Sequence, residues 1–281
     1  WSAGGVGIVQ TALGGRFGAG HRHSLTGKSQ LKPSWLAPSL ILAMALAGSG
    51  CSTPENHRAS STMALIRNRG QLICGVEGTM PGFSWLSPSN REQGLDADLC
   101  RAVAASLLGD GERVRFIHLS AAERFTALGS GEVDLLARNT SISLSRDAAG
   151  GNAISFGPIV YYDSQGLLVP VASGVRAAAD LAGQPICVVT GTTTEQNLAD
   201  WGRRNSIAIT PLKFQTHDQS LTAYLQGRCT AVTSSRALLA ARRSTFRNPQ
   251  AHKLLKEELS QEPLAPATRQ GDHGWADAVR W

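Results

Sequence analysis

Beyond its first 50 positions, the sequence lacks any extended run of Lys and Arg residues. The whole chain of 281 residues carries a net charge of +6, with 27 basic and 21 acidic residues. Four of the basic residues precede residue 50, where no acidic residue occurs, so 23 basic residues remain against 21 acidic ones. A surface that binds nucleic acid needs clustered positive charge to follow the phosphates. We therefore expect no nucleic-acid partner.

The motifs of metal centres and of common catalytic sites are absent as well. No two cysteines have the spacing Cys-x-x-Cys and no tract is rich in histidine, so we predict no metal site. The sequence has no phosphate loop of the form Gly-x-x-x-x-Gly-Lys and no recognisable Ser-His-Asp or Cys-His arrangement. These absences predict a protein without a cofactor and without catalytic activity.

An N-terminal segment has the order of residues found in an export signal. Lys28 and Lys32 precede the apolar residues 40–47, and small residues and Cys51 follow. The apolar stretch is too short for a membrane-spanning helix. We interpret residues 1–51 as a leader and predict a periplasmic or other extracytoplasmic location.

The end of this leader has two interpretations. Cys51 after small residues resembles the cleavage site of a bacterial lipoprotein, which would be lipidated at Cys51 and anchored to the membrane, although Gly48 stands where such sites usually have leucine. Cleavage near residues 45–47 without lipidation is the alternative. The chain has no methionine before Met44, so we interpret residues 1–27 as sequence outside the native protein or as the tail of a fragment.

The four cysteines that follow the leader are Cys74, Cys100, Cys187 and Cys229. Four cysteines allow three pairings. Cys74 and Cys187 each lie in or beside an apolar, strand-like run, and each has its next cysteine near the following element of the same half. We expect the pairs Cys74–Cys100 and Cys187–Cys229, each stabilising the fold by roughly 3 to 4 kcal/mol. Four buried free thiols are the alternative.

Short β-like runs alternate with helical patterns from residue 67 onward, which indicates an α/β fold. The first half predicts strands at 71–76, 114–119 and 133–137, a helix at 96–108, and a second helix that begins at the capping box of Ser120 and Glu123. On the first helix, the apolar face is expected to consist of Leu95, Leu99, Ala102, Val103 and Leu107.

The second half repeats this order of elements. A strand at 186–190 leads into a capping box of Thr192 and Glu195, and residues 221–235 echo residues 125–139 as helix, glycine, strand and polar loop. Two lobes of related construction would face each other across a cleft, and ligands of open α/β sheets bind at the carboxyl ends of the strands.

Several runs of the sequence together resemble a known family, the periplasmic solute-binding proteins of polar amino-acid ABC transporters, especially the general L-amino-acid-binding type. The matching runs, in order and with similar spacing, are 69–76, 94–104, 123–128, 138–140, 191–195 and 262–264. The resemblance implies a type II periplasmic binding protein with two α/β lobes and a two-segment hinge. Lobe 1 would comprise residues 66–166 plus 261–281, and lobe 2 residues 167–260. Because the chain stops at Trp281 in a helix-like pattern, we expect that a C-terminal part is missing.

The same resemblance implies the extracytoplasmic amino-acid-binding component of an ABC importer. Its partners would be an amino acid or a related small ligand and the permease subunits of the transporter, and the protein would be a monomer. Two alternatives remain: a ligand-sensing domain of a receptor, and an enzyme on the same two-lobed scaffold, because a fold does not determine a function.

Candidate ligand-binding residues follow from the resemblance in both halves. Arg146 would pair with the α-carboxylate of the ligand through its planar guanidinium, and a solvated arginine at a helix start is the alternative. Thr192 and Thr193, after Gly191, would offer a helix start to the same carboxylate, unless they only cap the helix. The polar loop of the first lobe adds Arg138, Asn139 and Ser141, whose alternative role is turn capping.

Ser235 departs from the family, whose members usually have an aspartate there to pair with the ligand's α-ammonium. The resemblance therefore predicts weak binding of standard α-amino acids, or a ligand whose amine is absent, modified or met by another residue. Capping of a helix at 236–243 is a further role that serine and aspartate share. Met80, Phe83 and Trp85 lie where the family often has an aromatic lid, and we expect Met80 to contribute only apolar packing.

Overall fold

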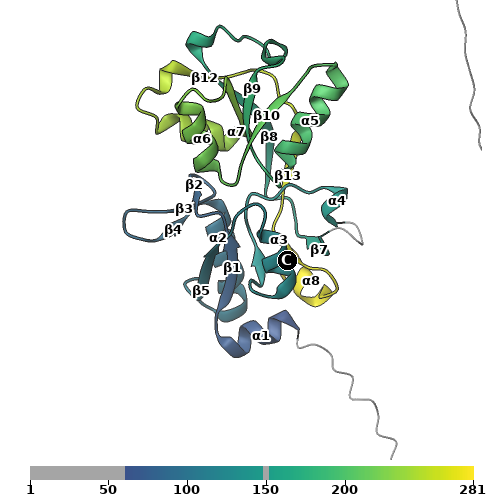
Figure 1. Cartoon of the computed structure of the whole chain (residues 1–281). Helices are drawn as coiled ribbons and strands as arrows, with labels where there is room; N and C mark the ends of the chain where they lie inside the picture. The colour runs from purple at the N-terminus through teal and green to yellow at the C-terminus, as the bar shows by residue number, and fades with distance from the viewer. Residues whose placement is uncertain (1–60, 148–151) are drawn as a thin grey trace, which may run out of the picture. The chain divides into compact units, whose positions relative to one another are not determined.

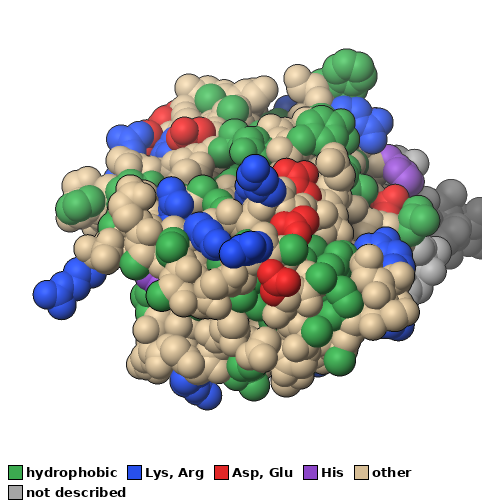
Figure 2. Space-filling view, turned by 90° about the horizontal axis from the view of Figure 1, so that it is seen from above, with side chains coloured by type: hydrophobic (Ala, Val, Ile, Leu, Met, Phe, Trp, Pro, Cys, Tyr) green, Lys and Arg blue, Asp and Glu red, His purple; other side chains and the backbone are tan. Residues whose placement is uncertain are grey.

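The computed structural model describes residues 61–147 and 152–281. The predicted leader, including Cys51 and its lipidation, lies outside the described residues. Within the described ranges, no helix has both the length and the apolar character needed to cross a membrane. Figure 2 shows one face of the molecule, on which Lys and Arg side chains are interspersed with acidic, apolar and neutral groups.

The first lobe is built on a five-stranded sheet in the order β5-β1-β6-β14-β7. Its strands are β1 (Leu72–Val76), β5 (Val114–His118), β6 (Leu135–Leu136), β7 (Ile154–Phe156) and β14 (Ala267–Arg269). β1 runs parallel to β5 and β6, and β14 runs antiparallel to β6 and β7. A small antiparallel sheet of β2 (Thr79–Met80), β3 (Ser84–Leu86) and β4 (Glu92–Gln93) follows β1.

The helices of the first lobe are α1 (Thr62–Arg69), α2 (Leu95–Leu108), α3 (Arg124–Ser130), α4 (Leu144–Asp147) and α8 (His273–Arg280). The C-terminal segment belongs to this lobe, because it supplies β14 and α8 (yellow in Figure 1), and α8 contacts α1. Trp275 of α8 is fully buried, and its indole Nε1 donates a hydrogen bond of 2.9 Å to the carbonyl oxygen of Asp134. Through this packing, α8 contributes to the same apolar core as α1, β1 and α2.

The second lobe has a sheet in the order β10-β9-β11-β8-β12. Its strands are β8 (Tyr161–Pro170), β9 (Pro185–Val189), β10 (Thr210–Phe214), β11 (Ala231–Ser235) and β12 (His252–Leu254), and its helices are α5 (Thr193–Asn205), α6 (His217–Leu225) and α7 (Arg236–Ser244). Three short 3₁₀ helices lie at Val171–Ser173, Ala178–Leu181 and Pro249–Ala251. The apolar core of this lobe is built around β8, β9 and α5.

Two segments pass between the lobes. The first residues of β8 pair antiparallel with β13 (Gln261–Leu264), and its later residues pair with β11 and β12 inside the second lobe. Within the first pairing, Asp163 lies directly opposite Glu262. The predicted division at residues 166 and 167 therefore falls within β8, and the lobe boundaries remain predictions.

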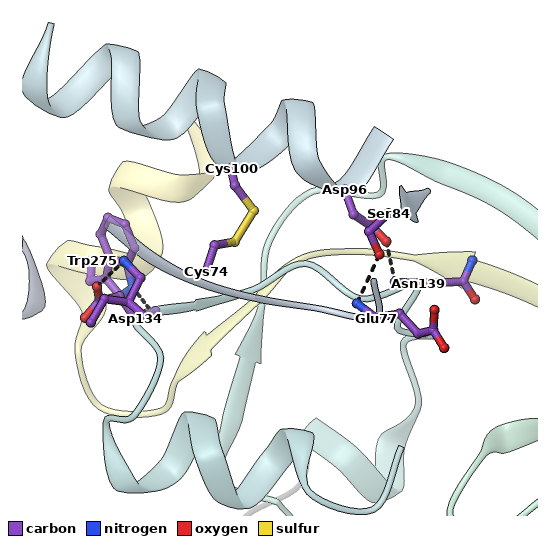
Figure 3. Close-up of a disulfide and its surroundings, with 9 residues drawn as sticks. Cys74, Glu77, Ser84, Asp96, Cys100, Asp134, Asn139 and Trp275 are labelled. Atoms are coloured by element: carbon purple, nitrogen blue, oxygen red, sulfur yellow. Dashed lines mark hydrogen bonds between the residues drawn. A yellow bond between two sulfur atoms is a disulfide. The ribbon is translucent and has the colours of Figure 1, made fainter. Parts of the chain in front are cut away.

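A disulfide lies in each half of the described chain. Cys74 of β1 is bonded to Cys100 of α2, and Cys187 of β9 is bonded to Cys229 just before β11. Figure 3 shows the first disulfide between its strand and its helix, with Asp96 at the helix start. These are the two pairs expected from the sequence, and each joins a central strand to a neighbouring element.

The local predictions differ from the structure at two helices. The buried side chains of α2 are Asp96, Ala97, Cys100, Val103 and Ala104, whereas Leu95 is 37% exposed and Ala102 is exposed. The predicted face is confirmed for Val103, Leu99 and Leu107, which pack in or against the core, and is wrong for Leu95 and Ala102. The buried side of α2 is instead centred nearer to Cys100, which is bonded to β1. The predicted start of the next helix was four residues early. Ser120 and Glu123 do form reciprocal hydrogen bonds, but across a turn that precedes α3.

Candidate functional site

One pocket is lined by polar residues from both lobes and from the two crossing strands. All seven ligand-binding residues predicted from the sequence line it. Arg138, Asn139, Ser141 and Arg146 come from the first lobe, and Thr192, Thr193 and Ser235 come from the second. The structure thus brings the predicted residues together around a single space, although their contact with a ligand remains a prediction.

Arg146 reaches the pocket from the short helix α4. The side chain is 7% exposed, and its Nη1 donates a hydrogen bond of 2.7 Å to the carbonyl oxygen of Ser141. The guanidinium carbon also lies 5.3 Å from the centre of the Phe125 ring. Among the described residues, Nε and Nη2 have no hydrogen-bond partner, so part of the planar group is free to bind an anion. Burial lowers the pKa of Arg146 to about 10, which leaves it a cation at neutral pH.

Arg138 and Asn139 follow β6 at the edge of the pocket. The Nε of Arg138 donates a hydrogen bond of 2.7 Å to the carbonyl oxygen of Leu119, and burial lowers the pKa of this guanidinium. Asn139 has a φ of 44°, a left-handed conformation that asparagine tolerates. Its backbone N–H donates to the carboxylate of Asp96 at 3.0 Å, and Figure 3 shows its side chain extending away from that contact. The buried amide Nδ2 of Asn139 has no protein partner among the described residues.

Arg124 is a third buried arginine of the pocket, for which the sequence predicted no role. Its side chain is 3% exposed and lies over the Phe125 ring, 4.3 Å from the centroid. Nη1 donates to the carbonyl oxygen of Ala121, and Nη2 donates across the pocket to Gly191 at 3.2 Å. Burial lowers the pKa of Arg124, and the neighbouring Arg138 and Arg146 lower it further. The first lobe therefore presents a concentration of positive charge to the pocket.

The start of α5 forms the side of the pocket that belongs to the second lobe. Thr192 is the N-cap residue, and its hydroxyl accepts a hydrogen bond of 3.2 Å from the backbone N–H of Glu195, as the capping box predicts. The Thr193 hydroxyl lies 3.2 Å from the hydroxyl of Ser141 in the first lobe. Gly191 precedes the helix with a φ of 70°. The first-turn N–H groups and the positive end of the helix dipole give this wall an affinity for anions.

Ser235 performs the capping role predicted for it and makes a second contact. Its Oγ accepts a hydrogen bond of 3.2 Å from the backbone N–H of Leu238 at the start of α7. The same hydroxyl donates to the carboxylate of Asp163 on β8. Asp163 also accepts backbone hydrogen bonds from Ser164 at 2.8 Å and from Ala237 at 3.3 Å. The carboxylate beside residue 235 is thus supplied by a crossing strand.

Glu262 is the second carboxylate of the pocket and lies on the other crossing strand. It is 6% exposed. It accepts hydrogen bonds from the Thr193 hydroxyl at 3.1 Å, the Asn197 amide at 2.6 Å and the Ser260 hydroxyl at 2.5 Å. Its negative charge also favours the protonated form of Arg146. Glu262 therefore connects the hinge to the start of α5.

His217 and Met80 complete the pocket without adding charge. His217 begins α6 and is 8% exposed. Burial, with a contribution from nearby arginines, lowers its pKa to about 3, so the ring is neutral at physiological pH. Met80 is 2% exposed and packs with Phe83, Leu238 and Leu264, as expected for an apolar role.

The sequence offered signals for some of the residues that the prediction missed. Arg124 is the first residue of α3, where a positive charge is unfavourable because the helix dipole is positive at that end. An arginine at this unfavourable position is a signal that its side chain has another role. Asp163 and Glu262 lie in the two segments that cross between the lobes. Asp163 approaches Ser235 through the pairing of β8 with β11, and Glu262 approaches Thr193 from 69 positions away. No local pattern reveals contacts over such separations.

Comparison with known proteins agrees with this architecture. The model of the bacterial extracellular solute-binding proteins, family 3, matches residues 72–279. The chain is 39% identical to the general L-amino acid-binding periplasmic protein AapJ of Rhizobium johnstonii, over 86% of this chain and 70% of the relative. It is also 39% identical to the glutamate/glutamine/aspartate/asparagine-binding protein BztA of Rhodobacter capsulatus, over 89% of this chain and 71% of the relative.

A solved structure shares both the fold and much of the sequence. It is the ABC transporter periplasmic binding protein from Brucella ovis with glutathione bound, which is 42% identical to this chain with a TM-score of 0.75. The match covers 79% of this chain and 69% of the Brucella chain. The family match, the two lobes and the pocket between them lead to one conclusion: the chain belongs to family 3 of the bacterial extracellular solute-binding proteins.

Proposed function

We propose that this protein is the extracytoplasmic amino-acid-binding component of an ABC importer. It captures its ligand between the two lobes and delivers it to the permease subunits. The observation that carries this proposal is the composition of the pocket. Arg146 of the first lobe and the Thr192–Thr193 helix start of the second lobe line the same space.

The two walls of the pocket suit an α-carboxylate. The free part of the Arg146 guanidinium can form the two-point pairing that planar carboxylates favour. The first turn of α5 adds backbone N–H donors and a positive dipole end. A carboxylate held in this way is desolvated only when both lobes contact it, so binding and lobe closure are coupled.

The names of the relatives support this ligand class. AapJ is named for binding general L-amino acids, and BztA for binding glutamate, glutamine, aspartate and asparagine. The Brucella relative is named as an ABC transporter protein, which supports the permease subunits as the partner of this chain. The family consists of extracellular proteins, so the chain acts outside the cytoplasm. Anchoring through a lipid on Cys51 remains a prediction.

We also propose that the protein binds its ligand without converting it. Its relatives AapJ and BztA are named as binding proteins. In the pocket, the neutral His217 is hydrogen-bonded to the Ser234 hydroxyl at 3.4 Å. Among residues 61–147 and 152–281, neither of the two is paired with a carboxylate in the manner of a catalytic triad.

A thermal-shift screen of the twenty amino acids tests the function. A ligand at a hundredfold excess over its Kd stabilises a protein by about 2.7 kcal/mol. For a chain of this size, such a gain raises the melting temperature by roughly 5 to 10 °C. We expect this shift for at least one amino acid, which should be recovered unchanged. Arg146→Ala should abolish the shift. The matched control Arg203→Ala, on the exposed side of α5, should retain it.

A further inference from the structure

We propose that Asp163 is the carboxylate that receives the ligand's α-ammonium group, with Ser235 as its positioning residue. This inference rests on the proposed function, because it concerns the amine of the same amino acid. It assigns the specificity for an amine to a strand that crosses between the lobes.

The charges around the pocket require a carboxylate for any bound ammonium. Arg124, Arg138 and Arg146 are all more than nine-tenths buried, and together their positive charges repel any further cation that enters the pocket. The acidic residues that line the described pocket are Asp163 and Glu262. Neither forms an ion pair with Lys, Arg or His of residues 61–147 or 152–281 within 4.0 Å. The pocket thus has acidic groups whose charge is available to a ligand.

Of these two acids, Asp163 has the charge that is less engaged by the arginines of the pocket. Each acid accepts three hydrogen bonds and has one oxygen with a single bond, Oε2 of Glu262 from Thr193 and Oδ2 of Asp163 from Ser235. The negative charge of Glu262 already stabilises the cation of Arg146. In Asp163, Oδ1 accepts the backbone N–H groups of Ser164 and Ala237, and Oδ2 lies beside Ser235. A carboxylate oxygen can accept a further hydrogen bond from an ammonium. The contacts to Oδ1 hold the group in place before the ligand arrives.

Cross-strand pairing gives a second, independent reason for a cation at this position. Asp163 and Glu262 are directly opposite each other in the antiparallel pair of β8 and β13. Directly opposed residues of an antiparallel pair project to the same face, and like charges there repel. A ligand ammonium beside Asp163 would relieve this repulsion. The ammonium would attract the carboxylates on both hinge strands, Asp163 of β8 and Glu262 of β13, when the ligand binds.

The contacts of Ser235 explain why a serine suits this position. Its hydroxyl hydrogen is directed at Asp163, and its oxygen accepts the N–H of Leu238. An aspartate at residue 235 would place a second carboxylate against Oδ2 of Asp163, at a like-charge cost. The serine instead orients the carboxylate of Asp163 and retains the helix cap.

Isothermal titration of variants with two ligands tests this assignment. The ligands are the tightest-binding amino acid of the screen and its des-amino analogue, which keeps the carboxylate. Asp163→Asn should weaken binding of the amino acid by about thirtyfold or more, the range seen when one partner is removed from a desolvated charge pair. The des-amino analogue should change by less than about threefold, because it has no ammonium to lose. Asp200→Asn, a change outside the pocket, should alter neither affinity.

Relocation of the charge provides the sharpest readout. Because residue 235 contacts Oδ2 of Asp163, the double variant Asp163→Asn/Ser235→Asp should recover most of the lost affinity for the amino acid. In the wild-type background, Ser235→Asp should not strengthen binding. If Asp163→Asn proves unstable, Ser235→Ala serves in its place, with a several-fold loss that is restricted to the amine-bearing ligand.

Three results would overturn the assignment. The first is an unchanged amino-acid affinity in Asp163→Asn. The second is an equal loss for both ligands, which would indicate a purely structural role for Asp163. The third is a tenfold gain from Ser235→Asp alone. If the wild type binds the amino acid and one of these results is found, only the assignment of Asp163 fails. If the wild type binds none of the twenty amino acids, the proposed function fails with it.

Discussion

Arg124 and Gly191 are joined by a hydrogen bond across the pocket, from the guanidinium Nη2 to the carbonyl oxygen at 3.2 Å. A second bond between the lobes links the hydroxyl groups of Ser141 and Thr193. Hydrogen bonds of this kind contribute only about 1 kcal/mol each. They align the two walls of the pocket, but a ligand that contacts both walls would add much more to their association.

Ligand binding should therefore close the lobes and reduce the radius of gyration of the protein. The physical reason is that Arg146 and the start of α5 lie on different lobes, and both are needed to desolvate one carboxylate. Small-angle X-ray scattering with and without saturating amino acid measures the change. An identical radius of gyration in the two samples would argue against closure.

Arg146→Lys should weaken amino-acid binding by about tenfold or more, even though the charge is retained. A lysine ammonium cannot reproduce the planar, two-point pairing of a guanidinium with a carboxylate. Isothermal titration calorimetry gives the two dissociation constants. Arg203→Lys, on the exposed side of α5, provides the matched control, since it makes the same change outside the pocket. Equal affinities for wild type and Arg146→Lys would reduce Arg146 to a structural role.

Removal of either disulfide should destabilise the fold substantially. Cysteines 26 positions apart close one loop and cysteines 42 apart close the other. Chain-entropy estimates for loops of these lengths are about 3.5 and 4 kcal/mol. Denaturant unfolding of the double variants Cys74→Ala/Cys100→Ala and Cys187→Ala/Cys229→Ala measures the two losses. Mass spectrometry of an unreduced digest checks the pairing, and a disulfide between Cys74 and Cys229 would contradict both assignments.

The stability of the ligand-free protein should depend on His217 at mildly acidic pH. Burial lowers the pKa of His217 to about 3 from the ordinary value of 6.5. Between these values, the unfolded chain binds a proton that the folded chain does not. The stabilising contribution of the neutral ring is thus complete above pH 6.5 and declines as the pH falls toward 3.

The comparison of wild type with His217→Gln isolates this effect, because the variant has no titrating group at that position. On acidification from pH 7 to pH 5, the wild type should lose up to about 2 kcal/mol more than the variant. The contribution of Asp96 to stability has the opposite pH dependence, because burial raises the pKa of this carboxyl to about 7. Asp96 is present in both proteins, so its contribution cancels in the comparison. Parallel loss of stability in the two proteins would contradict the burial of a neutral His217.

Local patterns in the sequence were sufficient to predict most of the elements that carry the site. The capping box at Thr192 and Glu195 predicts the start of α5 because its hydrogen bonds connect residues only three positions apart. The same locality explains the prediction that Ser235 caps α7. The resemblance to the family then assigned Arg146, Arg138 and Asn139 to one site, and the structure brings them to one pocket.

Properties that depend on distant pairing were not predictable in the same way. The buried side of α2 includes Cys100, which is bonded to β1, and leaves Leu95 and Ala102 at the surface. The carboxylate beside Ser235 comes from Asp163, 72 positions away, through the pairing of β8 with β11. Arg124 reaches Gly191 only because the lobes meet. In each case, tertiary contacts determine which side chains face the site.

A crystal structure of the protein with its tightest-binding amino acid would test the central claim most directly. We predict that the α-carboxylate lies within hydrogen-bonding distance of the Arg146 guanidinium and of the backbone N–H groups at the start of α5. The α-ammonium should lie against the carboxylate of Asp163. A ligand bound outside this pocket, or one whose carboxylate contacts only one lobe, would contradict the account.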